Sequence, residues 1–476
     1  MRCGRDVTTS GVLTRVGTAD EAEDVAIPIG RLRSMGAASG GADASADGTQ
    51  VVGLPIGENC LTPKGFARFV APCAGGWGIA RGAMQVPETV MLFTSPLGCG
   101  RHGSMAAYMH GYRDRMYYLD ATEEDLVMGA HMDHVEEAVA RIMEMRKPAP
   151  RAFYLFSTCV DDLLGSDYRS VCAKLERRYG IPFVDGHMDP ISMTSSTPPP
   201  VNLQRSIYRF LQKAGKIPAK RGEANIIGGF APVMGGSELH ALLASAGYHT
   251  VRQMTACKTF DEFCLMRGAS FNILLKPFGR LACEDMRRGL GIPWFLTGMP
   301  IDPDHVARMY EGLGESLGAE IDCKEYELHA RQALDDAAPW MAGLNIAVGS
   351  SLNGSTFEIA AVLARAGANI SFLVAEELSE SDAPFIDYLG RVDPAIPIYP
   401  GTHPGMSLVA GAPRATDVAI GFDVARLAPE AAVVEWGVDR QPFGFQALEY
   451  LLRSVHDALS SKRDAKELMY SKGLVV

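Results

Sequence analysis

Short apolar runs alternate with longer amphipathic stretches along this chain from about residue 51 onward. The runs are nearly continuous in apolar residues, which is typical of strands that are buried on both faces of a parallel sheet. The stretches between them have the apolar spacing of helices. We expect strands at 89–94, 153–157, 224–228, 271–276, 344–348, 370–374, 417–421 and 432–436. The pattern therefore predicts an α/β chain of mostly parallel sheets flanked by helices.

A partial internal repeat indicates how the chain is divided. Residues 176–183 (ERRYGIPF) are echoed by residues 287–294 (RRGLGIPW), each after a strand and a helix. In both copies a helix ends in basic residues, a glycine can form the left-handed cap, and a proline stops the helix. Residues 36–49 are small and polar, so they bury little apolar surface. We predict a flexible N-terminal extension at 1–50, three Rossmann-like domains at 51–215, 216–338 and 339–460, and a C-terminal tail at 461–476.

Composition narrows the functional classes. The 476 residues are 47% apolar and 21% charged, which is ordinary for a globular protein with more than one core. The net charge of −11 argues against a nucleic-acid partner, because phosphate backbones are bound by clustered Lys and Arg. No run reaches the roughly 18 apolar residues of a membrane span, and the first residues lack a secretion signal. We therefore expect a cytoplasmic protein with no membrane partner.

Three of the ten cysteines stand in glycine-rich turns or directly after a predicted strand. Cys73 begins Cys-Ala-Gly-Gly, Cys99 lies in Leu-Gly-Cys-Gly, and Cys159 follows the strand at 153–157. Backbone N–H groups in such turns stabilise thiolates, and thiolates select iron–sulfur clusters, zinc or copper(I). Structural zinc sites usually use Cys-x-x-Cys pairs, which this sequence lacks, so zinc ranks behind an iron–sulfur cluster. The alternative for any single cysteine is packing as a small apolar side chain, and we interpret the other seven as packing or incidental.

Two later glycine-rich turns, at 228–236 and 349–354, follow predicted strands. Helix N-termini after such turns can bind phosphate groups. Neither turn matches G-x-x-x-x-G-K-[ST] or G-x-G-x-x-G, so we do not expect this chain to bind a nucleotide.

Several segments resemble motifs of the nitrogenase component 1 family. Residues 95–100 (SPLGCG) resemble the family's Gly-Pro-x-Gly-Cys turn, and residues 124–130 (EDLVMGA) resemble its acidic-apolar-Gly-Gly segment. Residues 157–167 (STCVDDLLGSD) are similar to its Thr-Cys…Ile-Gly-Asp-Asp stretch. The likeness continues to Gln-Pro-Phe-Gly-Phe at 441–445 and covers about residues 73–459.

The resemblance implies an oxidoreductase subunit that pairs with a related component 1 chain, as a homo- or heterodimer or a heterotetramer. Members hold an iron–sulfur cluster at the interface of the two chains, and the matching cysteines are Cys73, Cys99 and Cys159. The cluster would be a 4Fe-4S cluster or a larger P-cluster-like one, with its remaining ligands from the partner. Electrons would come from a separate dimeric iron–sulfur ATPase, the reductase, in keeping with the lack of a P-loop motif in this chain.

Two departures from the family pattern argue against reduction of dinitrogen by this chain. Catalytic nitrogenase chains hold a large metal cofactor through a Cys after the second domain's strand and a His two residues before a Trp. Here Pro277 and Val434 stand at those places, and Cys283 would be a ligand only under a shifted alignment. We therefore expect reduction of a small-molecule substrate other than dinitrogen. A noncatalytic scaffold for cofactor assembly, or a companion subunit, remains an alternative, and a metal-free ligand-binding protein is a third reading.

Histidine and glutamate side chains offer candidates for substrate contact or proton delivery. His187, His403 and Glu435 would border the cleft between the domains. His131 and His134 share one helix face, which we expect to be solvated. His102 lies close to Cys99 in the sequence and could support the cluster without ligating it.

Overall fold

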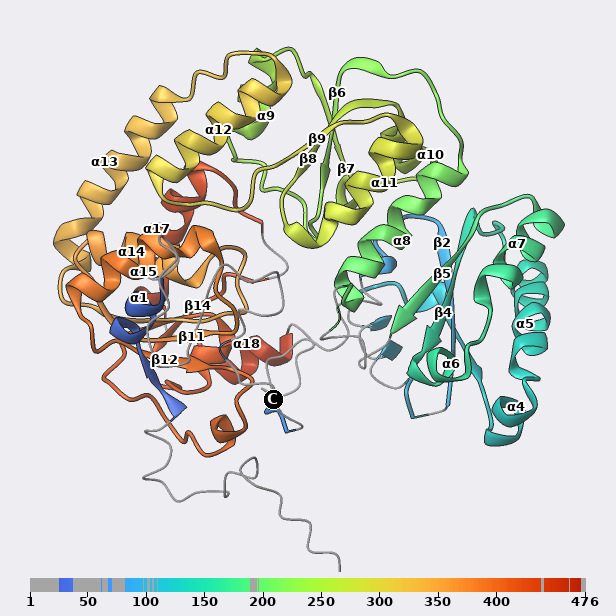
Figure 1. Ribbon diagram of the computed structural model, residues 1–476, viewed down its shortest axis with the longest axis horizontal. Coiled ribbons are helices and arrows are strands. Elements are labelled where there is room, and N and C mark those ends of the chain that lie inside the picture. Colours follow the sequence, from blue (N-terminus) through green and yellow to red (C-terminus); the bar gives the residue numbers. More distant parts are fainter. Residues whose placement is uncertain are drawn as a thin grey trace, which may run out of the picture.

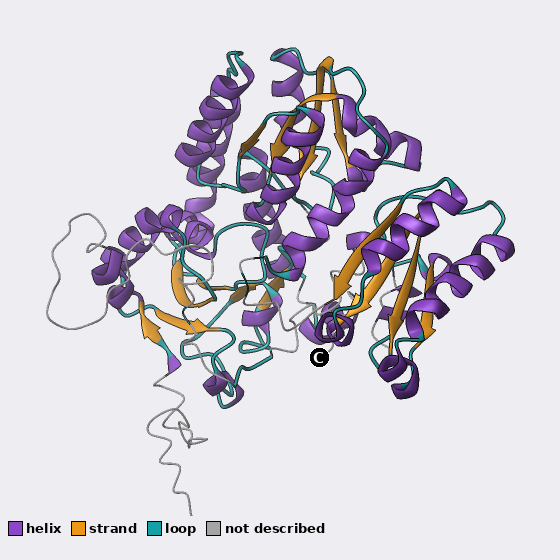
Figure 2. Cartoon of the chain, turned by 45° about the vertical axis from the view of Figure 1, so that its right-hand side comes forward, coloured by secondary structure: helices purple, strands orange, loops and turns teal. Residues whose placement is uncertain are grey.

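The strands of this chain form three separate sheets, of four, four and six strands. The structure is a computed structural model that describes residues 25–36, 61, 67–70, 82–96, 98–100, 103–104, 107–108, 110–188, 195, 197–437, 441–461 and 463–471. Helices flank each sheet (Figures 1 and 2). The predicted fold class, several mostly parallel sheets flanked by helices, is confirmed. The exact domain boundaries stay a prediction.

The first sheet is entirely parallel, in the order β3-β2-β4-β5. Its two central strands, β2 and β4, are buried along their whole length, as their apolar sequences require. The strands are β2 (Thr89–Ser95), β3 (Met116–Asp120), β4 (Ala152–Thr158) and β5 (Phe183–Met188). The helices around them are η3 (Arg113–Arg115), α4 (Glu123–Met128), α5 (His131–Met145), α6 (Cys159–Leu164) and α7 (Tyr168–Tyr179).

The second sheet is also parallel, in the order β7-β6-β8-β9. Helix α8 packs against both β5 and α11 and so joins the first sheet to the second (Figure 1). The strands are β6 (Lys220–Ile227), β7 (Thr250–Gln253), β8 (Ala269–Leu274) and β9 (Trp294–Leu296). The helices are α8 (Pro199–Lys213), α9 (Leu239–Ser245), η5 (Met254–Ala256), α10 (Phe260–Leu265), η6 (Met266–Gly268), η7 (Pro277–Gly279), α11 (Arg280–Leu290) and α12 (Pro303–Leu317).

The internal repeat has the local structure that the sequence predicted. Helix α7 ends at Gly180 and α11 ends at Gly291, and both glycines adopt the left-handed conformation, with φ of 67° and 80°. The strands β5 and β9 begin three residues after these glycines.

The third sheet has the order β1-β12-β11-β10-β13-β14, and only β1 runs antiparallel to its neighbour. Its strands are β1 (Ile27–Pro28), β10 (Asn345–Val348), β11 (Asn369–Ala375), β12 (Pro397–Pro400), β13 (Val418–Ile420) and β14 (Ala432–Val434). Its helices are α1 (Ile29–Gly36), α13 (Lys324–Met341), α14 (Thr356–Arg365), η8 (Glu380–Asp382), α15 (Ala383–Val392), η9 (Pro404–Ser407), α16 (Phe422–Ala425), α17 (Phe445–Ser460) and α18 (Ala465–Ser471). None of the described helices is long and apolar enough to cross a membrane.

Glu238 fastens the third sheet's helix α17 to the second domain. Its buried carboxylate accepts hydrogen bonds from the Tyr310 hydroxyl (2.7 Å) and from the backbone N–H of Phe445 (2.7 Å) and Gln446 (3.3 Å). The carboxylate thus satisfies N–H groups at the helix N-terminus that have no partner within the helix. A Cβ at Gly444 would lie 1.8 Å from a carboxylate oxygen, so only glycine fits there.

Parts of both chain ends depart from the expected extension and tail. Strand β1 pairs with β12, and Ile29 and Leu32 of α1 are 0% and 4% exposed within the core. At the other end, Met469 of α18 is buried against the core of the third domain. The physical reason is that β1 covers an otherwise open sheet edge and the apolar side chains of both segments fill gaps beside the sheet. Residues 1–24 and 37–50 of the predicted extension lie outside the described residues.

Candidate functional site

Cys99 and Cys159 lie at the same edge of the first sheet. Strands β2 and β4 are parallel neighbours, and Phe93 pairs with Phe156, so the carboxyl ends of both strands meet at one edge. Cys99 follows β2 in a turn in which its N–H donates to the Pro96 carbonyl at 2.9 Å, and Cys159 is the first residue of α6. Cys99 is exposed and Cys159 is half-buried, so neither thiol is packed into the core. Cys73 and His102 lie outside the described residues.

Close packing explains the glycine that follows Cys99. A Cβ on Gly100 would lie 2.5 Å from Cε1 of Tyr118, which is too close for any side chain. The Tyr118 ring packs edge-on against Phe93, with 5.6 Å between ring centroids, and its burial raises its pKa. The turn that carries Cys99 therefore packs against the first sheet through the Tyr118 ring.

His131 connects three helices beside this edge. Its Nε2 lies 3.1 Å from Oδ1 of Asp161 in α6 and 3.3 Å from the Ser166 hydroxyl, and its Nδ1 lies 3.4 Å from the Asp125 carbonyl in α4. The expected solvated position is wrong for His131, which is 2% exposed, because α4 and α6 cover the start of α5. The His134 side chain is 41% exposed, as expected. His131 therefore fixes α4 and α6 relative to each other next to Cys159.

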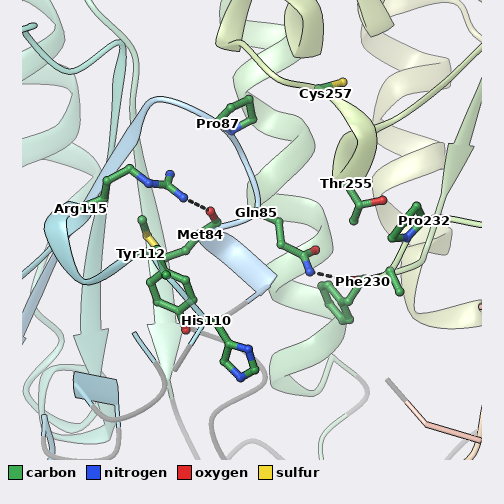
Figure 3. Close-up of a pocket in the computed structure, with 12 residues that line it drawn as sticks. Met84, Gln85, Pro87, His110, Tyr112, Arg115, Phe230, Pro232, Thr255 and Cys257 are labelled. Atoms are coloured by element: carbon green, nitrogen blue, oxygen red, sulfur yellow. Dashed lines mark hydrogen bonds between the residues drawn. The ribbon is translucent and has the colours of Figure 1, made fainter. Parts of the chain in front are cut away.

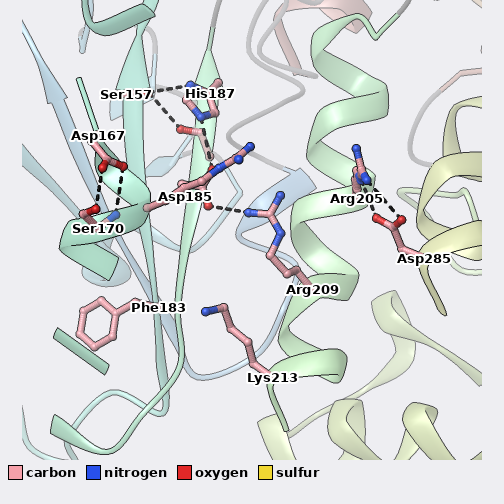
Figure 4. Close-up of polar contacts among 12 residues, drawn as sticks. Ser157, Asp167, Ser170, Phe183, Asp185, His187, Arg205, Arg209, Lys213 and Asp285 are labelled. Carbon is pink, nitrogen blue, oxygen red and sulfur yellow. Dashed lines mark hydrogen bonds and ion pairs between the residues drawn. The ribbon is translucent and has the colours of Figure 1, made fainter. Parts of the chain in front are cut away.

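His187, at the end of β5, belongs to a polar cluster near α6 (Figure 4). Its Nδ1 lies 2.9 Å from the Ser157 hydroxyl and 3.0 Å from Oδ1 of Asp162, and its Nε2 lies 3.4 Å from Oδ2 of Asp185. The hydrogen bond with Asp185 is the main reason that the pKa of His187 is raised. Burial would raise the pKa of Asp185, but hydrogen bonding to His187 and the charge of Arg209, 2.5 Å away, lower it to about 2. The raised pKa of His187 thus favours the protonated form of its ring.

A pocket of about 300 Å³ opens beside this cluster. His187, Asp162 and Asp185 line it, together with Asp161 and Tyr168. His187, one of the three side chains that we predicted for substrate contact or proton delivery, therefore lies beside a cavity close to Cys159.

His403 and Glu435 both follow strands of the third sheet but do not converge. His403 follows β12 and Glu435 follows β14, and three strands stand between them. At a strand spacing of about 4.8 Å, the ends of β12 and β14 are roughly 19 Å apart. Nδ1 of His403 accepts a hydrogen bond from the N–H of Gly405 at 3.1 Å, and burial lowers its pKa. The two residues stay separate predictions rather than one site.

A hydrogen-bonded bridge lies next to Pro277, one of the two positions that the resemblance predicts for a large metal cofactor. Pro277 begins η7 and Val434 ends β14, so neither supplies a thiolate or an imidazole. Next to Pro277, the Lys276 ammonium donates to Oδ1 of Asn353, and Nδ2 of Asn353 donates to the Gly437 carbonyl at 2.6 Å. Burial lowers the pKa of Lys276 to about 8. Sequence reasoning counted Lys276 as the last residue of the expected strand at 271–276 and did not single it out, whereas β8 ends at Leu274.

Cys283 does not serve as a substitute ligand in this arrangement. It is 0% exposed in the core between the first two sheets, and burial raises the pKa of its thiol. The buried thiols of Cys172 and Cys264 are likewise packed among apolar side chains, as predicted.

The chain's own side chains occupy the two later glycine-rich turns. In the turn after β10, the Asp423 carboxylate accepts from the N–H of Ser350 at 2.6 Å and from its hydroxyl at 2.9 Å. A Cβ on Gly349 would lie 1.9 Å from Asp423. In the turn after β6, a Cβ on Gly229 would lie 2.5 Å from Oε1 of Gln441. An internal carboxylate therefore stands where a phosphate would bind the turn of the third domain.

The donors at the cysteine edge form a partial set within the described residues. There, no three His, Cys, Asp or Glu side chains are grouped closely enough to hold a metal ion. Cys99 and Cys159 supply two soft donors on one edge, and thiolates of this kind fit an iron–sulfur cluster better than magnesium or calcium. Any full set needs further ligands, and the third predicted cysteine, Cys73, falls outside the described residues.

Comparisons with known proteins agree with this architecture. The nitrogenase iron-molybdenum cofactor biosynthesis protein NifE of Rhizobium meliloti (strain 1021) is 30% identical over 130 residues, which cover 25% of this chain and 27% of that protein. The nitrogenase molybdenum-iron protein alpha chain of Methanococcus maripaludis is 20% identical over 269 residues, 53% of this chain and 55% of that protein. The matched stretches thus span between about a quarter and about half of these relatives.

Structure and family agree as well. The solved structure "Nitrogenase Cp1 at pH 6.5" has a TM-score of 0.63 with 14% identity and covers 84% of this chain and 94% of that one, so it shares the fold. The family model for nitrogenase component 1 type oxidoreductases matches residues 75–393. This chain therefore belongs to the nitrogenase component 1 type oxidoreductase family.

Proposed function

We propose that this chain is a nitrogenase-like oxidoreductase subunit whose Cys73, Cys99 and Cys159 ligate an iron–sulfur cluster at the interface with a related component 1 chain. The observation that carries the proposal is the position of Cys99 and Cys159 after neighbouring parallel strands, with both thiols outside the core. Three thiolates underfill a 4Fe-4S cluster, so the partner supplies the remaining ligands, to that cluster or to a larger P-cluster-like one. The bound cluster would supply one-electron transfer at low potential.

An exposed apolar surface beside the cysteines supports docking of other proteins. Val127 and Met128 at the end of α4 are 77% and 75% exposed, and Leu163 and Leu164 at the end of α6 are 76% and 53% exposed. His131 holds the two helices together, so these side chains project from the same edge of the sheet. Large exposed apolar side chains that gather in this way mark interaction sites. We assign this surface, the apolar docking surface, to contact with the partner chain or with the dimeric iron–sulfur ATPase reductase.

The electrons would reach a small-molecule substrate other than dinitrogen in a cytoplasmic complex. Pro277 and Val434 offer no ligand to the large cofactor of catalytic nitrogenases, and the Lys276–Asn353 bridge lies beside the first of these places. His187 is the strongest of the three candidates for proton delivery, because its hydrogen bonds with carboxylates favour the protonated ring.

A noncatalytic scaffold for cofactor assembly is the second candidate function. The observation in its favour is the 30% identity with a NifE cofactor biosynthesis protein over 130 residues. The two functions differ in their turnover. An enzyme reduces its substrate repeatedly when the reductase and ATP are present, whereas a scaffold binds a cluster and releases it without turnover.

Anaerobic purification of the chain with its partner tests the cluster. We expect a brown complex that contains iron and sulfide and has an EPR signal when reduced. Substitution of Cys73, Cys99 or Cys159 by Ala should remove the iron, because each change deletes a ligand. The matched control is Cys264→Ala, which changes a thiol that is 7% exposed and packed in the core. A complex that contains zinc and no iron, or full iron content in the Cys99→Ala variant, would contradict the proposal.

A further inference from the structure

A cavity of about 440 Å³ lies between the first and second domains (Figure 3). One wall comes from the segments that lead into β2 and β3, and the other comes from the turns after β6 and β7. The carboxyl ends of parallel strands are the usual place for ligands in α/β sheets. Ligand pockets commonly enclose about 300–1,000 Å³, so this cavity has the size of a small-molecule site.

The charge on the cavity wall is positive. The Arg115 guanidinium lines the cavity and donates to the carbonyl oxygens of Met84 (2.7 Å), Val86 (3.1 Å) and Thr89 (3.2 Å). These neutral acceptors hold the guanidinium in place without cancelling its charge. No carboxylate is among the described residues that line the cavity, and the adjacent Asp114 pairs with Arg146. The wall therefore attracts an anion.

Part of the remaining wall is apolar and aromatic. Phe230 lines the cavity and is stacked on Phe278, with 5.5 Å between ring centroids and 10° between the planes. Tyr112, Met84 and Pro232 also face the space. Stacked aromatic walls favour a flat ring as the ligand body.

Two polar atoms of the wall are buried without a hydrogen-bond partner in the described part of the chain. The Gln85 side chain donates through Nε2 to the Phe230 carbonyl, which leaves its Oε1 without a donor. The Thr255 hydroxyl, on the opposite wall, also has none. Buried polar groups are nearly always satisfied, but both atoms are shielded in this conformation, so each meets a polar ligand only after its side chain turns toward the cavity.

We propose that this cavity binds a small aromatic carboxylate that also carries a hydrogen-bond donor, such as a phenolic hydroxyl or a ring N–H. The carboxylate is drawn by the charge of Arg115, and the ring lies beside Phe230. The side chains of Gln85 and Thr255 turn toward the cavity, and their polar atoms pair with the hydrogen-bonding group of the ligand. The proposal stands apart from the cluster, because neither Cys99 nor Cys159 lines this cavity.

Calorimetric titration of the full-length protein with three matched probes tests the ligand class. The probes are 4-hydroxybenzoate, 4-hydroxybenzamide and 4-hydroxybenzylamine, which are similar in size but anionic, neutral and cationic. We expect saturable binding of 4-hydroxybenzoate, with an affinity about tenfold higher than that of the amide, and no measurable binding of the amine. Equal affinity for all three probes, or no saturable binding of 4-hydroxybenzoate, overturns the proposal.

Two substitutions locate the site. Pro232 is exposed at the rim, so Pro232→Glu should weaken 4-hydroxybenzoate binding about tenfold relative to the uncharged control Pro232→Gln. Thr255→Val keeps the side-chain shape and removes the hydroxyl, which should weaken binding about fivefold. Wild-type affinity in both Pro232→Glu and Thr255→Val overturns the assignment. Cys99→Ala should bind the probe as the wild type does, which separates failure of this site from failure of the cluster.

Discussion

Asp185→Asn should destabilise the first domain by removing a buried charge network. The Asp185 side chain is 7% exposed and accepts from Arg209 at 2.5 Å and from His187 at 3.4 Å. A carboxyl whose pKa falls from 3.8 to about 2 on folding stabilises the folded state by about 2.5 kcal/mol at neutral pH. For a unit of the size predicted for the first domain, this corresponds to a fall in Tm of about 5–10 °C.

Two titrating groups, Asp185 and His187, set how this loss of stability depends on pH. The contribution of Asp185 is present above about pH 3.8 and disappears as the pH falls toward about 2, because its pKa is lowered on folding. The pKa of His187 is raised by Asp185, so its contribution is fully present below its unfolded pKa of about 6.5 and is lost as the pH rises through its folded-state pKa. The difference in Tm between wild type and variant should therefore be largest from about pH 4 to pH 6.5.

Differential scanning calorimetry between pH 4.5 and pH 9 measures this difference. The control is Asp261→Asn, since the pair of Asp261 with Arg151 is exposed and should contribute less than about 0.5 kcal/mol. A Tm difference under about 2 °C at pH 6, or one that grows from pH 6 to pH 9, would refute the reasoning.

Three further predictions concern the turn, the apolar docking surface and the domain junction. Gly100→Ala places a Cβ 2.5 Å from the Tyr118 ring, so the Cys99 turn should shift and the iron content of the complex should fall, with little change in Tm; unchanged iron would contradict this packing. Leu163→Asp should weaken association with the partner or the reductase about tenfold in a surface-binding assay, whereas the control Leu328→Asp, 66% exposed on α13, should not. Gly444→Ala introduces a Cβ 1.8 Å from a buried carboxylate oxygen at a φ of 72°, and calorimetry should show a loss of at least about 2 kcal/mol.

The sequence predicted the strands that are continuous in apolar residues. All eight expected strands are present, and β2 and β4, which are buried along their whole length, consist mainly of apolar residues. Strands β1, β3, β5, β7, β9 and β12 were not among the eight. The internal repeat placed a helix stop directly before β5 (FVDGHM), but its aspartate, glycine and histidine break the apolar run by which the other strands were recognised. Glycine is required at position 186 of β5, because a Cβ would lie 2.3 Å from the Phe156 ring. The Asp185 carboxylate of the same strand pairs with Arg209 of helix α8. No local pattern could reveal those contacts.

For the candidate site too, the sequence predicted some features and not others. The position of Cys99 and Cys159 on one sheet edge followed from the sequence, because each cysteine comes just after an apolar strand and parallel strands end together. The burial of His131 did not, because its partner Asp161 is 30 residues away in the sequence. The sequence also did not reveal that Asp423 fills the glycine-rich turn at 349–354, because Asp423 and its partner Ser350 are 73 residues apart in the chain.

By itself, the sequence determined the α/β class, the placement of the thiols at strand ends, and the absence of a thiolate or imidazole at Pro277 and Val434. Only the tertiary structure decided which polar groups are buried and paired, such as His187 with Asp185, and where a cavity opens between the first two domains. The physical reason is that hydrophobic periodicity is a local property of the chain. The pKa of a side chain and the shape of a cavity depend instead on groups that only folding brings together.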